Sequence, residues 1–182
     1  MGKHTFIFLT FAISALLYSC EKAELPSTSD TGEKHQPVAP PDSTVFPQGV
    51  RNGSEEHPFL ASDLATGSVG LYILANETEK TNSWVTGYIV GYVNGTSIKH
   101  TEFDTGDVAS NIVIADSPYE TQIEAVVPIQ LSTGTTYARV RQALNIKDNP
   151  QRLYSKVAVF GKICPYMNVA GMKNTRDYKL LE

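Results

Sequence analysis

The sequence predicts a mainly β domain in which five short strands close into a small barrel, with one helix between the third and fourth strands. Short runs of alternating apolar and polar residues recur after residue 53, as is typical of strands. One passage, 135–150, instead repeats its apolar residues at helical spacing. A single strand-like run, 84–96, carries glycines at positions 87, 91 and 95, which indicates a strand that bends sharply.

The pattern of the first nineteen residues is typical of a signal peptide. A basic start precedes an apolar run that is too short and wrongly flanked to be a lasting transmembrane helix. Positions 17 to 20, Leu-Tyr-Ser-Cys, resemble the lipobox of bacterial lipoproteins, with Tyr18 bulkier than the usual residue. We therefore expect Cys20 to carry lipid and to become the mature N-terminus. The alternative is an ordinary signal peptide cut nearby, which leaves Cys20 without lipid.

Residues 20–52 are predicted to form a disordered, proline-rich tether. Five of the ten prolines of the chain fall in this segment, which has few large apolar residues. Such a segment cannot bury enough surface to offset the entropy cost of ordering it. We expect it to hold the folded domain, predicted at 53–182, away from a membrane.

A small N-terminal extension precedes the strands. In the segment HPFLASDLATG at 57–67, Ser62 can cap a short helix and Gly67 can end it. The next segment, VGLYILAN at 69–76, is rich in β-forming residues.

Two strands follow the glycine-rich run before the helix. SNIVIADS at 110–117 is a short apolar run that closes in a turn. VVPIQLS at 126–132 is another, in which Pro128 favours an edge strand or a bulge. The helical passage can be capped by Thr135 or Thr136, and the pair Asn149-Pro150 ends it.

Two further strands complete the chain. LYSKVAVFGKIC at 153–164 alternates, so that Val157, Val159 and Ile163 share one face. The segment VAGMKNTRDYKLL at 169–181 is the last strand. Neither an internal repeat nor a coiled-coil heptad is present in the sequence.

The alternation in 84–93 places the glycines among aliphatic residues. One predicted face carries Val85, Gly87, Ile89, Gly91 and Val93. The other carries Trp84, Thr86, Tyr88, Val90 and Tyr92. Missing side chains would leave holes in a flat sheet, but they relieve crowding where a strand coils tightly. Gly95 follows Asn94, and this pair is a turn signal.

A bent first strand, two more strands, a helix and two final strands follow the plan of the oligonucleotide/oligosaccharide-binding (OB) fold, a five-stranded barrel. The segments GYIVGYVNG at 87–95 and LNIKDNP at 144–150 are the most distinctive in a sequence that resembles the OB-like domain of Bacteroidetes lipoproteins of the DUF6359 type. The resemblance runs over about 55–182. It implies a binding-type domain of the cell envelope and brings no catalytic residues.

Charge is divided along the chain, although the net charge is only −4. Residues 21–136 hold 5 basic and 16 acidic residues, whereas 137–182 hold 9 basic and 3 acidic ones. The C-terminal part thus forms a basic sector that suits an anionic glycan, a nucleic acid or an acidic protein. Scattered solubilising charge is the alternative.

Few residues suggest catalysis or metal binding. Glu102, Asp104 and Asp107 share a loop that could hold Ca²⁺, but the order of a calcium loop is missing, and a solvated acidic loop is the simpler reading. Cys164 is expected to be a small buried residue rather than a nucleophile. The sequence has no phosphate-binding loop and no nucleophile motif, so we expect neither enzymatic activity nor a metal or cofactor.

Candidate ligand-binding residues combine the aromatic face with the basic sector. They are Trp84, Tyr88, Tyr92, Phe103, Arg139 and Arg141. Aromatic side chains in OB-type barrels provide stacking platforms. The alternative is that the aromatic face is packed beneath the N-terminal segments 57–64 and 69–74.

The predicted function is a binding module of the cell envelope. We expect an outer-membrane lipoprotein, on the periplasmic or the exposed side, that binds a glycan, a peptide or a protein partner without catalysis. One alternative is an accessory to extracellular nucleases that binds single-stranded nucleic acid. Another is a surface assembly or adhesion component that associates through an exposed edge strand.

Overall fold

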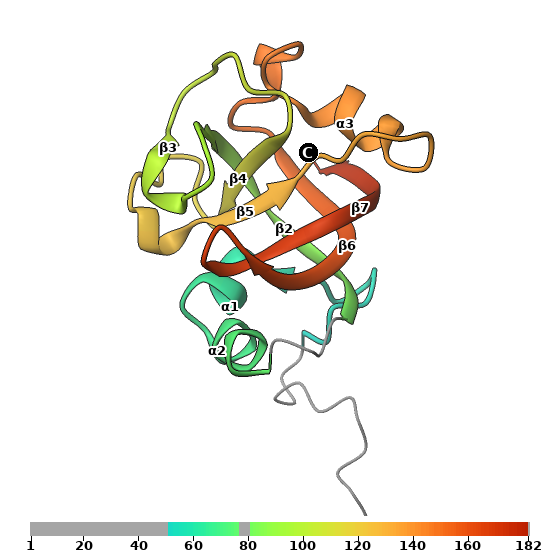
Figure 1. Cartoon of the computed structure of the whole chain (residues 1–182). Coiled ribbons are helices and arrows are strands. Elements are labelled where there is room, and N and C mark those ends of the chain that lie inside the picture. The colour runs from blue at the N-terminus through green and yellow to red at the C-terminus, as the bar shows by residue number, and fades with distance from the viewer. Residues whose placement is uncertain (1–50, 77–80, 182) are drawn as a thin grey trace, which may run out of the picture. The chain divides into compact units, whose positions relative to one another are not determined.

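The computed structural model describes residues 51–76 and 81–181 (Figure 1). The predicted signal peptide, Cys20 and nearly all of the predicted tether lie outside these residues. All of the described residues belong to one compact unit. The strands are β1 (Phe59–Leu60), β2 (Thr81–Val93), β3 (Thr101–Glu102), β4 (Asn111–Ala115), β5 (Val127–Gln130), β6 (Lys156–Tyr166) and β7 (Val169–Leu181). The α-helices are α1 (Ala61–Ala65), α2 (Ser68–Ala75) and α3 (Ala138–Leu144), and short 3₁₀ helices cover Ile98–His100, Ile123–Ala125 and Pro150–Arg152.

The fold is mainly β, as predicted, and its strands form one mixed sheet. β2 pairs antiparallel with both β4 and β6, and β4 pairs antiparallel with β5. β5 pairs in parallel with β7, which pairs antiparallel with β6. The pairings therefore lead from β2 through β4, β5, β7 and β6 back to β2. The short strands β1 and β3 each pair with β2.

The prediction of an edge or a bulge at Pro128 is wrong. β5 has partners on both sides, and Pro128 lies opposite Val113 of β4. The neighbouring strand β7 contributes Gly171 at this point, and a Cβ atom there would lie 2.8 Å from the Pro128 carbonyl oxygen. Gly171 thus lets the two backbones come close where proline offers no N–H group.

The predicted irregularity in the glycine-rich strand is present as a β-bulge. Ile89 of β2 lies opposite Ile114 of β4, while Gly91 lies opposite Val113. Val90 is therefore an extra residue in β2. A bulge of this kind bends the strand and increases its twist.

The bulge reverses the alternation of side chains, and the predicted faces of β2 are wrong beyond it. Val85 and Ile89 lie in the main core, as expected for one face. After the extra residue, Tyr92 lies in that core and Val93 lies in a second apolar cluster. One added residue moves every later side chain to the other face.

The glycines of β2 allow other strands to approach its backbone. A Cβ atom at Gly87 would lie 2.8 Å from the carbonyl oxygen of Ala115 in β4. At Gly91 a Cβ atom would lie even closer to the carbonyl oxygen of Glu102 in β3. Gly95 has a φ of +126° in the turn after β2, as the Asn-Gly pair predicts.

The main core joins the inner faces of the sheet to α1, α2 and the segment around α3. Val157, Val159 and Ile163 share this core, which confirms the face predicted for β6. The buried residues of the main core are Phe59, Ala61, Leu64, Val69, Ile73, Val85, Ile89, Tyr92, Ile112, Ile114, Val127, Ile129, Leu131, Val140, Leu144, Ile146, Val157, Val159, Ile163, Ala170 and Met172.

The second cluster lies on the other side of β4. Ile112 and Ile114 of β4 belong to the main core, whereas Val113 and Ala115 belong to the second cluster, because neighbouring side chains of a strand point to opposite faces. The buried residues of the second cluster are Val90, Val93, Ile98, Val113, Ala115 and Val126. Tyr88 and Phe103 are among the partly buried residues that pack against it.

The N-terminal extension contains the two-residue strand β1 and the helices α1 and α2, so the strand-like interpretation of 69–76 is wrong. α2 buries Val69 and Ile73, which are four residues apart and therefore lie on one side of a helix. The predicted short helix is α1, but its N-cap is Leu60 and Ser62 lies inside it. The Asp63 carboxylate accepts the Leu60 N–H at 2.9 Å, as an acidic residue in a first turn does.

The predicted helix between the third and fourth long strands is α3, which is shorter than expected. Its N-cap is Tyr137 rather than Thr135 or Thr136, and it ends at Asn145. The Asn145 side chain donates to the carbonyl oxygen of Arg141 at 2.7 Å and accepts from the N–H of Asp148 at 2.9 Å. These bonds turn the chain before Asn149-Pro150 is reached.

Candidate functional site

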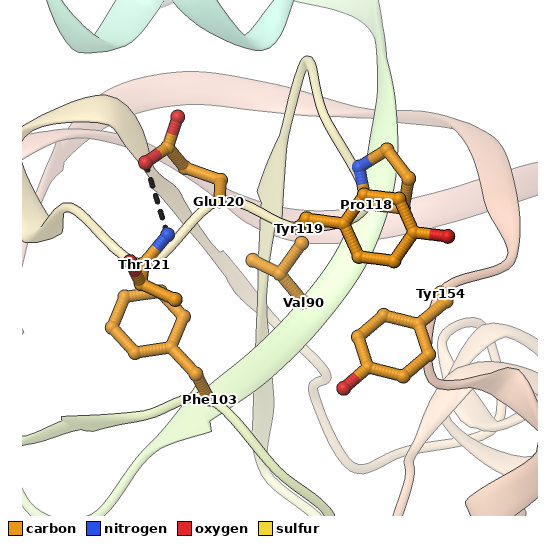
Figure 2. A pocket seen from close by; sticks show the side chains of 7 residues that line it. All are labelled: Val90, Phe103, Pro118, Tyr119, Glu120, Thr121 and Tyr154. Atoms are coloured by element: carbon orange, nitrogen blue, oxygen red, sulfur yellow. Dashed lines mark hydrogen bonds between the residues drawn. The ribbon is translucent and has the colours of Figure 1, made fainter.

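A hollow at one edge of the second cluster is lined by three aromatic residues among seven. We call it the tyrosine hollow. It has a volume of about 210 Å³ and is lined by Val90, Phe103, Pro118, Tyr119, Glu120, Thr121 and Tyr154. Figure 2 shows Val90 between Phe103 on one side and Tyr119 and Tyr154 on the other.

The floor of the tyrosine hollow comes from the bulged part of β2. Val90, the extra residue of the bulge, is only 1% exposed and packs in the second cluster. Phe103 follows β3 directly and packs against the same cluster. Gly91 lets β3 approach β2, so the bulge and the glycine together bring Phe103 beside Val90.

Two exposed tyrosine rings form one wall of the hollow. Tyr119 is 84% exposed and Tyr154 is 51% exposed. Their ring centroids are 6.3 Å apart and their planes are tilted by 43°. Exposed aromatic rings leave apolar area in contact with water, so their grouping around a hollow is typical of a binding site.

The backbone of Tyr154 is held in an unusual conformation. Its φ is +67°, in the left-handed region that non-glycine residues rarely adopt. The Tyr154 N–H donates to the carbonyl oxygen of Ile89 at 2.7 Å, and the Ile89 N–H donates to the carbonyl oxygen of Ser155 at 3.0 Å. These two bonds fix Tyr154 beside the bulge. Strain of this kind persists where surrounding contacts enforce it, and it is frequent at ligand sites.

The loop that carries Tyr119 is tied by its own side chains. The Tyr119 N–H donates to the Ser117 hydroxyl oxygen at 3.3 Å. One Glu120 carboxylate oxygen accepts the N–H groups of Thr121 at 2.9 Å and Gln122 at 2.8 Å. The backbone segments that carry the two rings are therefore held in place before any ligand arrives.

A second, more polar hollow lies beside Lys156, and we call it the lysine hollow. It has a volume of about 120 Å³ and is lined by Leu60, Thr86, Gly87, Tyr88, Asp116 and Lys156. The Lys156 ammonium lies 5.5 Å from the centroid of the Tyr88 ring, a cation–π distance. The Asp116 carboxylate accepts the Ser62 N–H at 3.3 Å.

The four aromatic residues predicted to bind ligand do not share one face. Phe103 lines the tyrosine hollow, and Tyr88 lines the lysine hollow. Trp84 is 7% exposed, with its ring 5.4 Å from that of Phe160. Tyr92 is 5% exposed and belongs to the main core. The roles of Trp84 and Tyr92 in ligand binding stay predictions.

The alternative prediction was that the whole aromatic face of β2 packs beneath the N-terminal segments. This is wrong, because the tyrosines of β2 are divided between two clusters. The N-terminal residues Phe59, Leu64 and Ile73 pack in the main core with Tyr92, while Tyr88 packs against the second cluster. The bulge separates these tyrosines, because the alternation of β2 changes between them.

Tyr92 takes part in a hydrogen-bond network with Glu102 of β3 and Asn94. Its hydroxyl donates to Glu102 at 2.5 Å, and the Asn94 side chain donates to the other Glu102 oxygen at 2.8 Å. These bonds hold the pKa of Glu102 below its ordinary value. The bond to Glu102, with a contribution from burial, raises the pKa of Tyr92 to about 12. The hydrogen bond from Tyr92 to Glu102 fixes β3 to β2.

The two predicted arginines lie away from both hollows. Arg139 forms an ion pair with Asp177 and lies 5.5 Å from the centroid of the Tyr178 ring. Arg141 donates to the carbonyl oxygen of Leu131 at 2.9 Å. Their part in ligand binding stays a prediction.

No metal-binding group emerges from the described ranges, 51–76 and 81–181. Within them, no three His, Cys, Asp or Glu side chains are grouped so that they could hold a metal ion, and this holds for the loop with Glu102, Asp104 and Asp107. Cys164 is buried, as predicted.

Within the described part of the chain, none of the helices has the length and apolar character required to cross a bilayer.

The residues that dominate the tyrosine hollow were missed by the sequence analysis. Tyr119 and Tyr154 lie in connections between regular elements, where periodicity carries no information. The sequence did contain a usable signal, namely an aromatic residue within a polar connection. Such a residue is expected to be exposed, because a polar connection does not pack in a core. Pro118-Tyr119 and Tyr154 are of this kind, and functional residues concentrate in loops.

Comparison with known proteins gives a family for this arrangement. A family model described as a domain of unknown function, DUF6359, matches residues 68–181. This range includes α2, the strands from β2 to β7 and nearly all residues of both hollows. No curated protein and no solved structure matches the chain at a significant level. The chain belongs to the DUF6359 family.

Proposed function

We propose that this chain is a non-catalytic binding module that takes a neutral glycan in the tyrosine hollow. The observation that carries the proposal is the pair of exposed rings, Tyr119 and Tyr154, 6.3 Å apart over a floor of Val90 and Phe103. The C–H face of a sugar ring is apolar and packs against aromatic rings, while its hydroxyl groups remain free for hydrogen bonds.

The proposal includes an OB-like barrel made of β2, β4, β5, β7 and β6. Its support is the cycle of pairings, the parallel pairing of β5 with β7, and α3 between β5 and β6. OB-type barrels bind both oligosaccharides and oligonucleotides on their strands and loops. The fold alone therefore leaves both classes of polymer open.

Local charge favours a neutral ligand over a nucleic acid. The two hollows contain one basic side chain, Lys156, and two acidic ones, Asp116 and Glu120. Sites for single-stranded nucleic acid combine aromatic rings with a positively charged groove. Arg139 of the basic sector is paired with Asp177, and Lys179 is paired with Glu55.

Assembly through an edge strand has less support. Among the described strands, only β1 and β3 have a single partner, and each spans two residues. Edges this short offer few free backbone groups to another chain.

Binding to immobilised polysaccharides tests the proposed function. Retardation in gels that contain a neutral glucan, xylan or mannan is expected for the natural chain, and Tyr119→Ala should weaken it about tenfold. Because Tyr119 is 84% exposed, its loss should leave the fold intact. Tyr137→Ala is the control, since Tyr137 lines neither hollow. Salt-sensitive binding of single-stranded DNA without any glycan binding would contradict the proposal.

The module is anchored through lipid on Cys20 and held off the membrane by the tether. The support is the lipobox pattern at positions 17 to 20 and the proline-rich composition that follows it. Cys20→Ala should move the chain from the membrane fraction to the soluble fraction of cells, because the acyl chains supply the buried CH₂ groups of the anchor. Unchanged fractionation in the same cells would exclude a lipid anchor.

A further inference from the structure

We infer that the tyrosine hollow and the lysine hollow form one extended site, which accommodates consecutive units of a single neutral glycan chain. The inference rests on the proposed function and narrows the class of ligand that the site binds. The ligand is then an oligosaccharide or polysaccharide segment rather than a single sugar.

The first support is that the same three segments line both hollows. β2 contributes Tyr88 to one hollow and Val90 to the other. The connection after β4 contributes Asp116 and Pro118 in the same way, and the segment that leads into β6 contributes Lys156, the first residue of the strand, and Tyr154, which lies just before it.

The members of each pair are two positions apart in the sequence, with one residue between them. Tyr88 precedes the bulge and Val90 is its extra residue, and both side chains contact the second cluster, so they lie on the same side of β2. Lys156 lies directly opposite Tyr88 in the pairing of β6 with β2. The two hollows are therefore neighbours on one surface, and the direction from one hollow to the other follows β2.

The chemistry of the two hollows is complementary to successive sugar units. The tyrosine hollow offers ring faces, whereas the lysine hollow offers polar groups that have spare hydrogen-bonding capacity. The Thr86 hydroxyl donates to the carbonyl oxygen of Val157 at 2.9 Å and keeps its own oxygen as an acceptor. Lys156 forms no ion pair with any described residue, and Asp116 accepts only the Ser62 N–H in this part of the chain. Hydroxyl groups of a sugar can use each of these partners.

The charges of the lysine hollow select against a polyanion. Lys156 and Asp116 line the same small space, so a ligand with a repeated negative charge meets a carboxylate beside the ammonium. A neutral polyol can instead accept from the ammonium and donate to the carboxylate.

The test is the dependence of affinity on chain length. The probes are cello-, laminari- and malto-oligosaccharides of one to six glucose units, titrated by calorimetry into the purified full-length chain. For at least one series, affinity should rise at least tenfold between the monosaccharide and the tetrasaccharide and then level off. Equal affinity at every length would overturn the extended site while leaving the proposed function in place. Binding of none of the probes at any length, together with no retardation by any polysaccharide, would overturn both.

Two variants test the lysine hollow directly. Lys156→Met removes the charge and keeps most of the length of the side chain, and Asp116→Asn keeps an acceptor for the Ser62 N–H. Each should lower the ratio of tetrasaccharide to monosaccharide affinity at least threefold, whereas Tyr119→Ala should weaken binding at every length. Lys162→Met, on the same strand but outside both hollows, is the matched control. An unchanged affinity ratio in both variants, with melting temperatures like that of the natural chain, would overturn the extended site.

Discussion

Replacing Gly91 by alanine is expected to lower the free energy of unfolding by about 3 kcal/mol. Strand propensity alone predicts the opposite, since alanine is more favourable than glycine within a strand by roughly 0.5–1 kcal/mol. The packing decides the sign. An added Cβ atom would lie less than 3.0 Å from the carbonyl oxygen of Glu102 and would force β3 away from β2. Phe103 moves with β3, so the tyrosine hollow should open as well.

Urea unfolding measures this effect, and Gly87→Ala provides a graded comparison in the same strand. The added Cβ atom at Gly87 would lie 2.8 Å from the Ala115 carbonyl oxygen, a milder clash. We expect a loss of about 1–2 kcal/mol there. If Gly91→Ala were as stable as the natural chain, the close approach of β3 to β2 would be disproved.

Replacing Tyr154 by glycine is expected to abolish most glycan binding while changing the free energy of unfolding by less than about 1 kcal/mol. The positive φ of Tyr154 costs a non-glycine residue about 1–2 kcal/mol, and glycine removes this cost. Glycine also loses the contacts of a half-exposed ring and gains entropy in the unfolded chain, which offset the gain. Loss of one ring of the pair should weaken binding about tenfold or more.

Tyr154→Ala separates backbone strain from the loss of the ring. Alanine removes the ring but keeps the strain, so this variant should be less stable than Tyr154→Gly by about 1 kcal/mol. Both should bind glycan equally weakly. Thermal unfolding and glycan titration of the two variants give the comparison. An alanine variant more stable than the glycine variant would show that no strain is stored at this residue.

The succession of strands and of α3 along the chain could be predicted, because each of these elements has its own local sequence pattern. β4, β6 and β7 match runs of apolar or alternating residues, and the turn signals between them are strong. The helix α2 could not be predicted from local patterns. Its sequence has β-forming residues, and the helix is stabilised by burial of Val69 and Ile73 in the main core, which is a tertiary effect.

The faces of β2 were predicted correctly only up to the bulge. Glycines at positions 87 and 91 do indicate an irregular strand, but no local pattern fixes which residue is the extra one. A single inserted residue, Val90, decides whether Tyr92 enters the main core or faces the second cluster.

Most residues of the candidate site could not be predicted from the sequence, for a related reason. Its walls come from two connections that are far apart in the sequence, around Tyr119 and Tyr154, and only the fold brings them together. Tyr88 was found because it lies on β2, where alternation can be followed. Phe103, which follows β3, was named only as an aromatic residue that could stack on a ligand.

A chemical-shift titration tests the central claim most directly. The backbone amide signals of the natural chain would be followed during addition of a neutral oligosaccharide that binds. The account predicts that the largest changes fall at 60, 86–90, 103, 116–121 and 154–156, the segments that line the two hollows. Changes centred instead on the basic residues around Arg139 and Arg176, with these segments unmoved, would contradict it.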